Sequence, residues 1–220
     1  MKKIRFEDGA EYQPSKIVCI GLNYVAHIEE MKSKRANEPV IFTKPNTSLH
    51  DITKPIPIPQ NFGEVHHEIE LAVCMAKEGR RIPESKAMDY VAGYALALDL
   101  TLRDVQFQAK QKGRPWALAK GFDHACPVSI FLAKDKIGRV DELNLLLKVN
   151  GEERQKGNTR QMLFSIPEII AYVSRFMTFL PGDILLTGTP AGVGPLQGGD
   201  RIEAGIDKIT NIQTTVVWDD

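Results

Sequence analysis

The chain has 220 residues, of which 43% are apolar, and its 28 basic and 28 acidic side chains cancel. A chain of this length can bury one sizeable core, so we expect a single domain over residues 1–220, with residues 1–15 as an N-terminal lead-in. Because the charges balance, the composition excludes a general affinity for nucleic acid or for an acidic membrane surface.

Targeting signals, membrane spans and disulfide frameworks leave patterns that this sequence lacks. Its first residues are charged rather than apolar, and no stretch approaches the roughly 20 apolar residues that span a bilayer. Cys19, Cys74 and Cys126 are odd in number and lie outside any C-x-x-C pair, so we expect reduced core residues. We therefore predict a soluble, cytoplasmic protein.

The first third of the chain is predicted to contain a strand, a helix and a loop. The apolar run from Ile17 to Ile20 predicts a strand, and a helix over Tyr24 to Lys32 follows, with Asn23 as its candidate N-cap. Four prolines between Pro45 and Pro59 predict a largely extended loop.

The segment from Val65 to Met75 alternates in a way that is typical of a strand. This pattern places His66, Glu68 and Glu70 on one face and His67 on the other. Two carboxylates thus point the same way.

A second strand, from Ala92 to Leu98, is predicted to end at Asp99, beside a helix. The sequence Thr101-Leu102-Arg103-Asp104 resembles a capping box and predicts that the helix runs to about Lys112. Farther along, Asn150-Gly151 between two strand-like runs predicts a hairpin turn.

The last third combines one well-marked helix with strands and turns. Ser165 and Glu168 predict a capping box, and apolar residues at helical spacing continue to Leu180, before Pro181-Gly182. Strands are predicted over 183–186 and 202–218, with a glycine-rich loop over 188–199. The pattern as a whole predicts an α+β fold that is mainly β.

Glu68 and Glu70 give the strongest chemical signal, because paired carboxylates on an apolar strand repel each other and are costly to desolvate. A divalent cation would neutralise them, and Asp99 supplies a third carboxylate at the end of the next strand. Hard cations prefer oxygen ligands, so this set indicates Mg²⁺ or Mn²⁺ rather than Zn²⁺. The alternative is an edge strand whose glutamates simply face solvent.

Two patterns that contain histidine leave alternatives open. Neighbouring strand residues face opposite sides, so His66 and His67 cannot both ligate one metal, and at most one lies near the carboxylates. His27 and Glu30 stand one helical turn apart, where a carboxylate can orient an imidazole that takes a proton from water. The same spacing also occurs on ordinary solvated helix faces.

The stretch from Leu186 to Gly194 is rich in glycine but lacks the Lys-Ser/Thr of a phosphate-binding loop and any dinucleotide fingerprint. We therefore expect no nucleotide. Backbone N–H groups in this stretch and the Thr189 hydroxyl can still approach an anionic substrate.

Short ordered motifs run along nearly the whole chain. They are Gly21-Leu22-Asn23-Tyr24 followed by His27, Phe42-Thr43-Lys44-Pro45, His67-Glu68-Ile69-Glu70, Asp99 with Thr101, Arg103, Asp104 and Gln106, Lys120-Gly121-Phe122-Asp123, and Leu186-Thr187-Gly188-Thr189-Pro190. Together they resemble the fumarylacetoacetate hydrolase family, and the short length resembles its acylpyruvase and oxaloacetate decarboxylase branch. The resemblance implies a mixed β-sandwich roll, usually assembled as a homodimer.

The resemblance also implies a role for each matching residue. One Mg²⁺ or Mn²⁺ per subunit would be held by Glu68, Glu70 and Asp99, with His27 and Glu30 as the dyad that activates water. The remaining roles are polarising groups at Lys120 and Gln106, and substrate contacts at Gly21, Arg103, Lys44 and Thr189.

The reaction implied is hydrolysis of an acylpyruvate, a small 2,4-diketo acid such as acetylpyruvate or fumarylpyruvate. Cleavage of its C3–C4 bond gives pyruvate and a carboxylic acid through a stabilised enolate. Oxaloacetate decarboxylation requires the same enolate and no water, so one site could support both reactions.

Two other hypotheses remain open at this stage. One is isomerisation or decarboxylation of an unsaturated dicarboxylic keto acid, of the 2-hydroxyhepta-2,4-diene-1,7-dioate type, or tautomerisation of oxaloacetate. A longer dicarboxylate would need a second cationic anchor, for which Lys44, Lys112 and Arg114 are candidates. The other is a catalytically silent binding protein, against which the His27/Glu30 pair speaks, because binding alone needs no general base.

Overall fold

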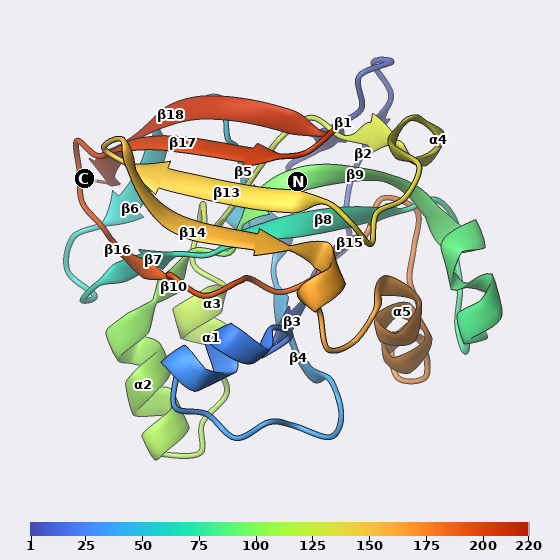
Figure 1. Ribbon diagram of the computed structural model, residues 1–220, viewed down its shortest axis with the longest axis horizontal. Coiled ribbons are helices and arrows are strands. Elements are labelled where there is room, and N and C mark those ends of the chain that lie inside the picture. The colour runs from blue at the N-terminus through green and yellow to red at the C-terminus, as the bar shows by residue number, and fades with distance from the viewer. Residues whose placement is uncertain (220) are drawn as a thin grey trace.

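Strands are more abundant than helices in the structure, a computed structural model that describes residues 1–219, and Figure 1 shows the strands curling into stacked sheets. The α+β fold expected from the sequence, mainly β, is confirmed. The largest sheet has eight strands, seven of them in the order β4-β3-β15-β8-β9-β11-β5, with β12 paired to β9. These strands are β3 (Ile17–Gly21), β4 (Val40–Lys44), β5 (Leu49–Asp51), β8 (Ile69–Met75), β9 (Val91–Leu98), β11 (Cys126–Val128), β12 (Leu132–Ala133) and β15 (Ile184–Leu186).

Three smaller sheets complete the β-structure. A five-stranded sheet has the order β14-β13-β17-β18-β6, a three-stranded sheet has the order β10-β7-β16, and β1 pairs with β2. Their strands are β1 (Ile4–Arg5), β2 (Glu11–Tyr12), β6 (Ile56–Pro59), β7 (Val65–His67), β10 (Thr101–Leu102), β13 (Asn144–Val149), β14 (Glu152–Asn158), β16 (Gly194–Leu196), β17 (Arg201–Ile206) and β18 (Thr210–Asp219). The stretch predicted as a loop between Pro45 and Pro59 therefore contains β5 and β6.

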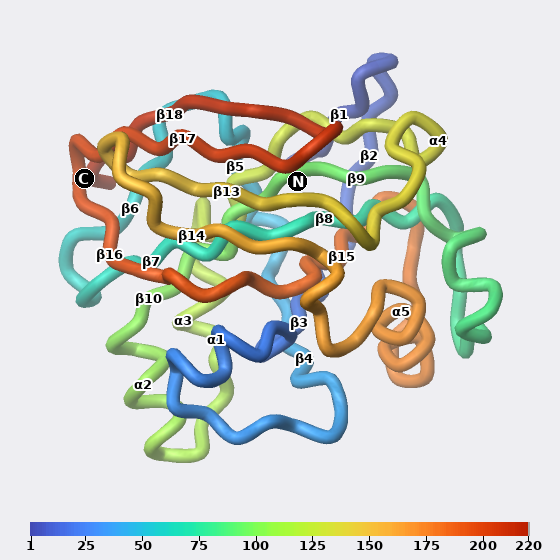
Figure 2. The backbone as a smooth tube through the Cα atoms, viewed as in Figure 1, coloured from blue at the N-terminus to red at the C-terminus, as the bar shows by residue number. Residues whose placement is uncertain are grey.

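The helices are short and lie outside the sheets. They are α1 (Val25–Glu30), α2 (Arg103–Gln111), α3 (Ala117–Lys120), α4 (Lys134–Ile137), α5 (Ile166–Ser174) and the 3₁₀ turns η1 (Asn46–Ser48), η2 (Glu84–Tyr90) and η3 (Thr159–Gln161). Figure 2 shows α1, α2 and α3 gathered on the side of the molecule opposite β17 and β18. Across residues 1–219, no helix combines the length and the apolar character that a membrane crossing requires.

Strand β8 is buried on both faces, although alternation by itself is typical of a strand with one buried face. Ile69, Leu71 and Val73 belong to one apolar cluster, whereas Ala72 and Cys74 belong to a second cluster on the other side. The expectation that all three cysteines are reduced core residues is also confirmed, because each is free and buried.

The predicted strand from Val65 to Met75 is interrupted at Glu68. Before it, β7 pairs with β10 and β16; after it, β8 pairs with β15 and β9. The chain thus passes from one sheet to another at this residue. The periodicity of the sequence gives no sign of this break, because it depends on which strands the two halves pair with.

Two predicted helix caps are wrong. Tyr24, not Asn23, is the N-cap of α1, and the Asn23 amide instead donates to the carbonyl oxygens of Phe164 and Thr187. Thr101 lies in β10, and its hydroxyl donates to the Asp99 carbonyl instead of capping α2. Asn23 thus joins segments that are distant in the sequence, whereas the Thr101 contact is local.

Two other local predictions are confirmed. Asn150 and Gly151 have positive φ values of 54° and 83° and connect β13 to β14, as an Asn-Gly hairpin turn requires. Ser165 and Glu168 form a reciprocal capping box at the start of α5. The helix ends at Ser174 rather than near Leu180, so it is shorter than the apolar spacing predicts.

Replacing Ser165 with alanine is expected to lower the free energy of unfolding by about 1 kcal/mol, because the N-cap acceptor of α5 is lost. Urea denaturation followed by circular dichroism measures the change. The matched control is Ser85→Ala, since Ser85 is an exposed serine in η2. Equal stability of the two variants would contradict the expectation.

Candidate active site

Three buried carboxylates form the centre of the site. Glu68 lies at the junction of β7 and β8, Glu70 lies in β8, and Asp99 directly follows β9. One oxygen from each lies within 4.8 Å of the others, and the residues are only 4%, 1% and 1% exposed. The predicted cluster therefore exists, and the alternative of a solvated edge strand is excluded.

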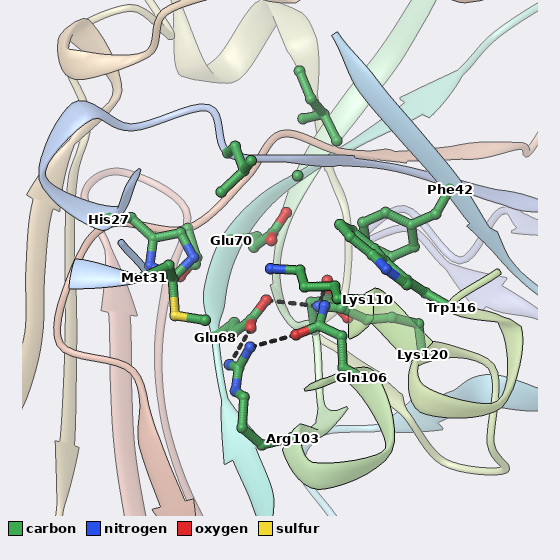
Figure 3. A pocket seen from close by; sticks show the side chains of 15 residues that line it. His27, Met31, Phe42, Glu68, Glu70, Arg103, Gln106, Lys110, Trp116 and Lys120 are labelled. Carbon is green, nitrogen blue, oxygen red and sulfur yellow. Dashed lines mark hydrogen bonds and ion pairs between the residues drawn. The ribbon is translucent and has the colours of Figure 1, made fainter. Parts of the chain in front are cut away.

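Three basic side chains surround these carboxylates, and Figure 3 labels two of them, Arg103 and Lys120. The Lys120 ammonium lies 2.8 Å from Glu68 Oε2 and 2.6 Å from Asp99 Oδ2. An Arg103 nitrogen donates to Glu68 Oε1 at 2.6 Å. Lys44 Nζ lies 2.7 Å from Asp99 Oδ1. The three carboxylates do not share these cations equally. Within residues 1–219, Glu68 and Asp99 form ion pairs with them, whereas Glu70 forms none.

This unequal pairing separates the pKa values of the two glutamates. Burial raises the pKa of Glu70 well above its usual value, and the nearby charges of Asp99 and Glu68 raise it further. Burial acts in the same sense on Glu68, but the Lys120 ammonium and the Arg103 guanidinium outweigh it and lower the pKa. In the absence of a cation, Glu70 is the one of the two glutamates that more readily holds a proton.

The donor set fits Mg²⁺ or Mn²⁺. All three candidate ligands are carboxylates, and neither His66 nor His67 belongs to the cluster. His66 Nε2 lies 2.9 Å from Glu64 Oε2, whereas His67 Nδ1 lies 2.9 Å from Gln155 Oε1. The buried Asp99 Oδ1 lies near Lys44 but accepts no hydrogen bond, so its lone pairs can still coordinate a metal cation.

His27 and Glu30 form a pair on α1 that faces the pocket. Glu30 Oε2 lies 2.9 Å from His27 Nδ1, and Glu30 Oε1 accepts from the Gly192 backbone at 2.9 Å. His27 is 6% exposed and lines the same pocket as the carboxylates. The pair is therefore not an ordinary solvated helix face. When Nδ1 carries the proton donated to Glu30, Nε2 is left with a free lone pair for base chemistry.

The remaining predicted site residues differ in how they meet the pocket. Gly21, Arg103, Gln106 and Thr189 lie in its wall. Gln106 Oε1 accepts from Arg103 at 2.7 Å, so it orients the guanidinium. The Thr189 hydroxyl donates to the Ile69 carbonyl at 2.8 Å, and its proton is therefore not available to an anion.

The cationic anchors proposed for a longer substrate do not reach the pocket. Lys44 is 1% exposed and donates to the carbonyl oxygens of Leu100 and Lys120, so it supports Asp99 from behind. Lys112 and Arg114 are exposed and lie outside the pocket wall. The structure places Lys110 in the wall instead, a residue that no motif in the sequence marks.

Aromatic residues that were also missed cover one side of the pocket. Phe42 and Trp116 lie in its wall with ring centroids 5.7 Å apart. Lys120 Nζ is 4.9 Å from the Phe42 centroid, and Lys110 Nζ is 5.3 Å from the Trp116 centroid. The two rings thus hold both ammonium groups by cation–π contacts, which no local sequence pattern reveals.

A strand-built fold with a buried carboxylate cluster and an adjoining histidine–glutamate pair defines a candidate metal centre with a general base. The chain belongs to the fumarylacetoacetate hydrolase family, because residues 16–217 match the family described as fumarylacetoacetate (FAA) hydrolase C-terminal. The mixed β-roll implied by the motifs is thereby confirmed.

Particular proteins of known sequence or structure are similar to this chain along most of its length. The chain is 54% identical over 196 residues to oxaloacetate tautomerase FAHD1, mitochondrial, from Homo sapiens, covering 89% of each chain. It is 50% identical over 198 residues to oxaloacetate tautomerase YcgM from Escherichia coli strain K12, covering 90% of each. A crystal structure of fumarylpyruvate hydrolase from Pseudomonas aeruginosa in complex with Mn²⁺ and pyruvate has a TM-score of 0.94 and 33% identity, covering 99% of this chain and 96% of that one.

Mn²⁺ affinity is expected to fall with falling pH, because the proton on Glu70 competes with the cation. The dissociation constant should rise about ten-fold per unit once the pH is below the raised pKa of Glu70 and should level off above it. Calorimetry in two buffers of different ionisation enthalpy measures the proton released on binding.

The matched variants are Glu70→Gln, which should lose this pH dependence, and Glu203→Gln in β17 of the five-stranded sheet, which should keep it. A dissociation constant that does not change with pH in the unmodified protein would show that Glu70 is already ionised.

Proposed function

We propose that this protein is a divalent-metal-dependent oxaloacetate tautomerase, which interconverts the enol and keto forms of the acid. The observation that carries the proposal is the balance of charge around the pocket. Three acidic side chains and three basic side chains lie in its wall, and these are Glu68, Glu70, Asp99, Arg103, Lys110 and Lys120.

Two further charged residues lie just outside the wall and also cancel. They are Lys44, a cation that contacts Asp99, and Glu30, an anion that contacts His27. A divalent cation would therefore leave two positive charges in a largely buried site, and a dianion neutralises them best. Oxaloacetate carries two carboxylates, whereas acetylpyruvate carries one, so the balance favours the dicarboxylic acid.

The chain supplies the groups that tautomerisation requires. The reaction moves one proton between C3 and the 2-oxo oxygen. His27, oriented by Glu30, is the base that takes the proton from one of these two atoms and delivers it to the other, so it ends the reaction in its starting form. The Lys120 ammonium, whose pKa is raised by Asp99 and Glu68 against the effect of burial, stabilises negative charge on the oxygen. A cation on the three carboxylates would add Lewis acidity toward the 2-oxo group.

The names of the two relatives support the same reaction, since both are oxaloacetate tautomerases at 50% identity or more over about nine-tenths of the chain. From the sequence alone, acylpyruvate hydrolysis is the first expectation and tautomerisation an alternative. The charge balance and these relatives support the reverse order.

Acylpyruvate hydrolysis is the second candidate, and the His27–Glu30 pair favours it. An imidazole that can take a proton from C3 can also take one from water, and the fumarylpyruvate hydrolase shares the fold. Fumarylpyruvate is also a dicarboxylate, so the charge balance does not separate it from oxaloacetate. Oxaloacetate decarboxylation would use the same stabilisation of an enolate without any base acting on water.

Three further inferences stay predictions. The isomerase of a long unsaturated dicarboxylate would have to use Lys110 as its second anchor, since the anchors first considered lie elsewhere. The homodimer is implied by the family likeness. The cytoplasmic location rests on the sequence, and the human relative is named as mitochondrial.

Purified protein with Mn²⁺ is expected to speed the loss of enol absorbance when enol oxaloacetate is dissolved in buffer, relative to a blank without protein. Glu68→Gln should abolish the acceleration, because it removes a metal ligand and the partner of Lys120. Proton NMR of the same samples, with acetylpyruvate added, detects acetate and pyruvate. Rapid acetate release without any effect on the enol would replace this proposal with the hydrolase.

Removing one positive charge from the pocket tests the charge balance directly. Lys110→Met should raise the Michaelis constant for oxaloacetate roughly two- to five-fold, and no more, since the Lys110 side chain is exposed and solvent screens its charge. The control is Lys112→Met, an exposed lysine at the end of the same helix. An equal Michaelis constant in both variants would show that charge balance does not select the substrate.

A further inference from the structure

One fully buried amide, that of Gln155, joins three parts of the structure beneath the site. Gln155 lies in β14, is 0% exposed and belongs to neither the carboxylate cluster nor the pocket wall. A glutamine amide has two donor and two acceptor positions. All four are used here, and a buried polar network that is fully satisfied is rigid and holds its members in one arrangement.

The oxygen of this amide holds the two residues on either side of Glu68. Gln155 Oε1 accepts from His67 Nδ1 at 2.9 Å and from the Ile69 backbone at 3.0 Å. Glu68 stands between them, at the point where the chain passes from β7 to β8. The direction of the Glu68 side chain therefore depends on how this short break in the strand is held.

The nitrogen of the same amide holds the loop that follows β15. Gln155 Nε2 donates to Thr189 Oγ1 at 2.8 Å and to the Pro190 carbonyl at 2.9 Å. Thr189 in turn donates to the Ile69 carbonyl, which closes a ring of hydrogen bonds. The Gly188 backbone in this loop donates to Glu70 Oε2 at 2.6 Å. One amide thus connects the supports of two candidate metal ligands.

An irregularity in the hairpin directs Gln155 inward. The register between β13 and β14 shifts after Leu147, so that Gln155 faces Leu147 while Lys148 faces Glu153. Its neighbours Arg154 and Lys156 are exposed, whereas Gln155 is buried. Bulges of this kind reorient a side chain and are common beside active sites.

We propose that Gln155 is a positioning residue for the metal centre, which sets the directions of Glu68 and Glu70 through the strand break and the loop. The proposal rests on the metal site of the proposed function, but not on which keto acid reacts there. It assigns no contact between Gln155 and the cation or the substrate.

The test compares Mn²⁺ affinity in four purified variants, measured from the electron paramagnetic resonance signal of free Mn²⁺. Gln155→Met keeps the size and loses all four hydrogen bonds. Gln155→Glu keeps the acceptors, loses both donors and places a carboxylate against the Pro190 carbonyl. The control for the substitution is Gln213→Met on the exposed part of β18.

The control for lost stability is Ser174→Ala in α5. Its hydroxyl is buried, accepts from the Ile82 backbone and donates to the Ala171 carbonyl, outside the wall of the metal pocket. Thermal unfolding of metal-free samples ranks the stability of all four variants, and every affinity is measured well below the lowest unfolding temperature.

Gln155→Met is expected to weaken Mn²⁺ binding about 10- to 100-fold, as the loss of a residue that orients metal ligands does. Gln155→Glu should weaken Mn²⁺ binding as well. It provides the test if the Gln155→Met variant does not fold. Both controls should bind as the unmodified protein does. Affinity within two-fold of the unmodified protein in the folded Gln155 variants, or an equal loss in Ser174→Ala, would overturn the proposal.

A failure of the proposed function would look different. Tautomerase activity could be absent while the Gln155 variants still lose Mn²⁺ affinity, and the positioning role would then stand. If the unmodified protein bound no Mn²⁺, the metal site and this inference would fail together.

Discussion

The burial of three carboxylates between layers of strands is the constraint on which the rest of the structure depends. Isolated charges in such a place would be prohibitively costly, so each must be paired, protonated or ligated. Lys120 and Arg103 pair with Glu68, Lys120 and Lys44 pair with Asp99, and Glu70 is left with a raised pKa. The site is thereby prepared for a cation whose binding displaces a proton rather than another protein charge from Glu70.

The same constraint explains why several sheets meet at this point. Glu68 sits where the chain leaves one sheet for another, and the glycine-rich loop after β15 lies against β8. Gly188 needs its positive φ of 93°, and a side chain there would meet Asn23. Backbone and amide groups from distant strands therefore hold the acids in place together with the ion pairs.

The groups proposed to act on the reacting atoms differ from those that would distinguish one substrate from another. In the proposed function the His27–Glu30 pair is the base and Lys120 the cationic stabiliser, and the same groups would serve tautomerisation, hydrolysis or decarboxylation of a small 2-oxo acid. What differs among the candidate substrates is their charge and length. Under this proposal, selection among them would rest on the surrounding cations and on the other residues of the pocket wall, such as Lys110 and Trp116.

Local chemistry in the sequence determined the features that depend on neighbours along the chain: the Asn150-Gly151 turn, the capping box at Ser165, the alternation that pairs Glu68 with Glu70, and the single helical turn between His27 and Glu30. Tertiary structure decided whatever depends on pairing between distant strands. It broke the strand at Glu68, used Asn23 as a tie between distant segments, and drew Thr101 into a strand paired with β7. It also put Lys44 behind Asp99 and Lys110 in the wall, and buried Gln155. The reason is physical: a hydrogen bond or ion pair across the fold leaves no periodic trace in either of the segments that it joins.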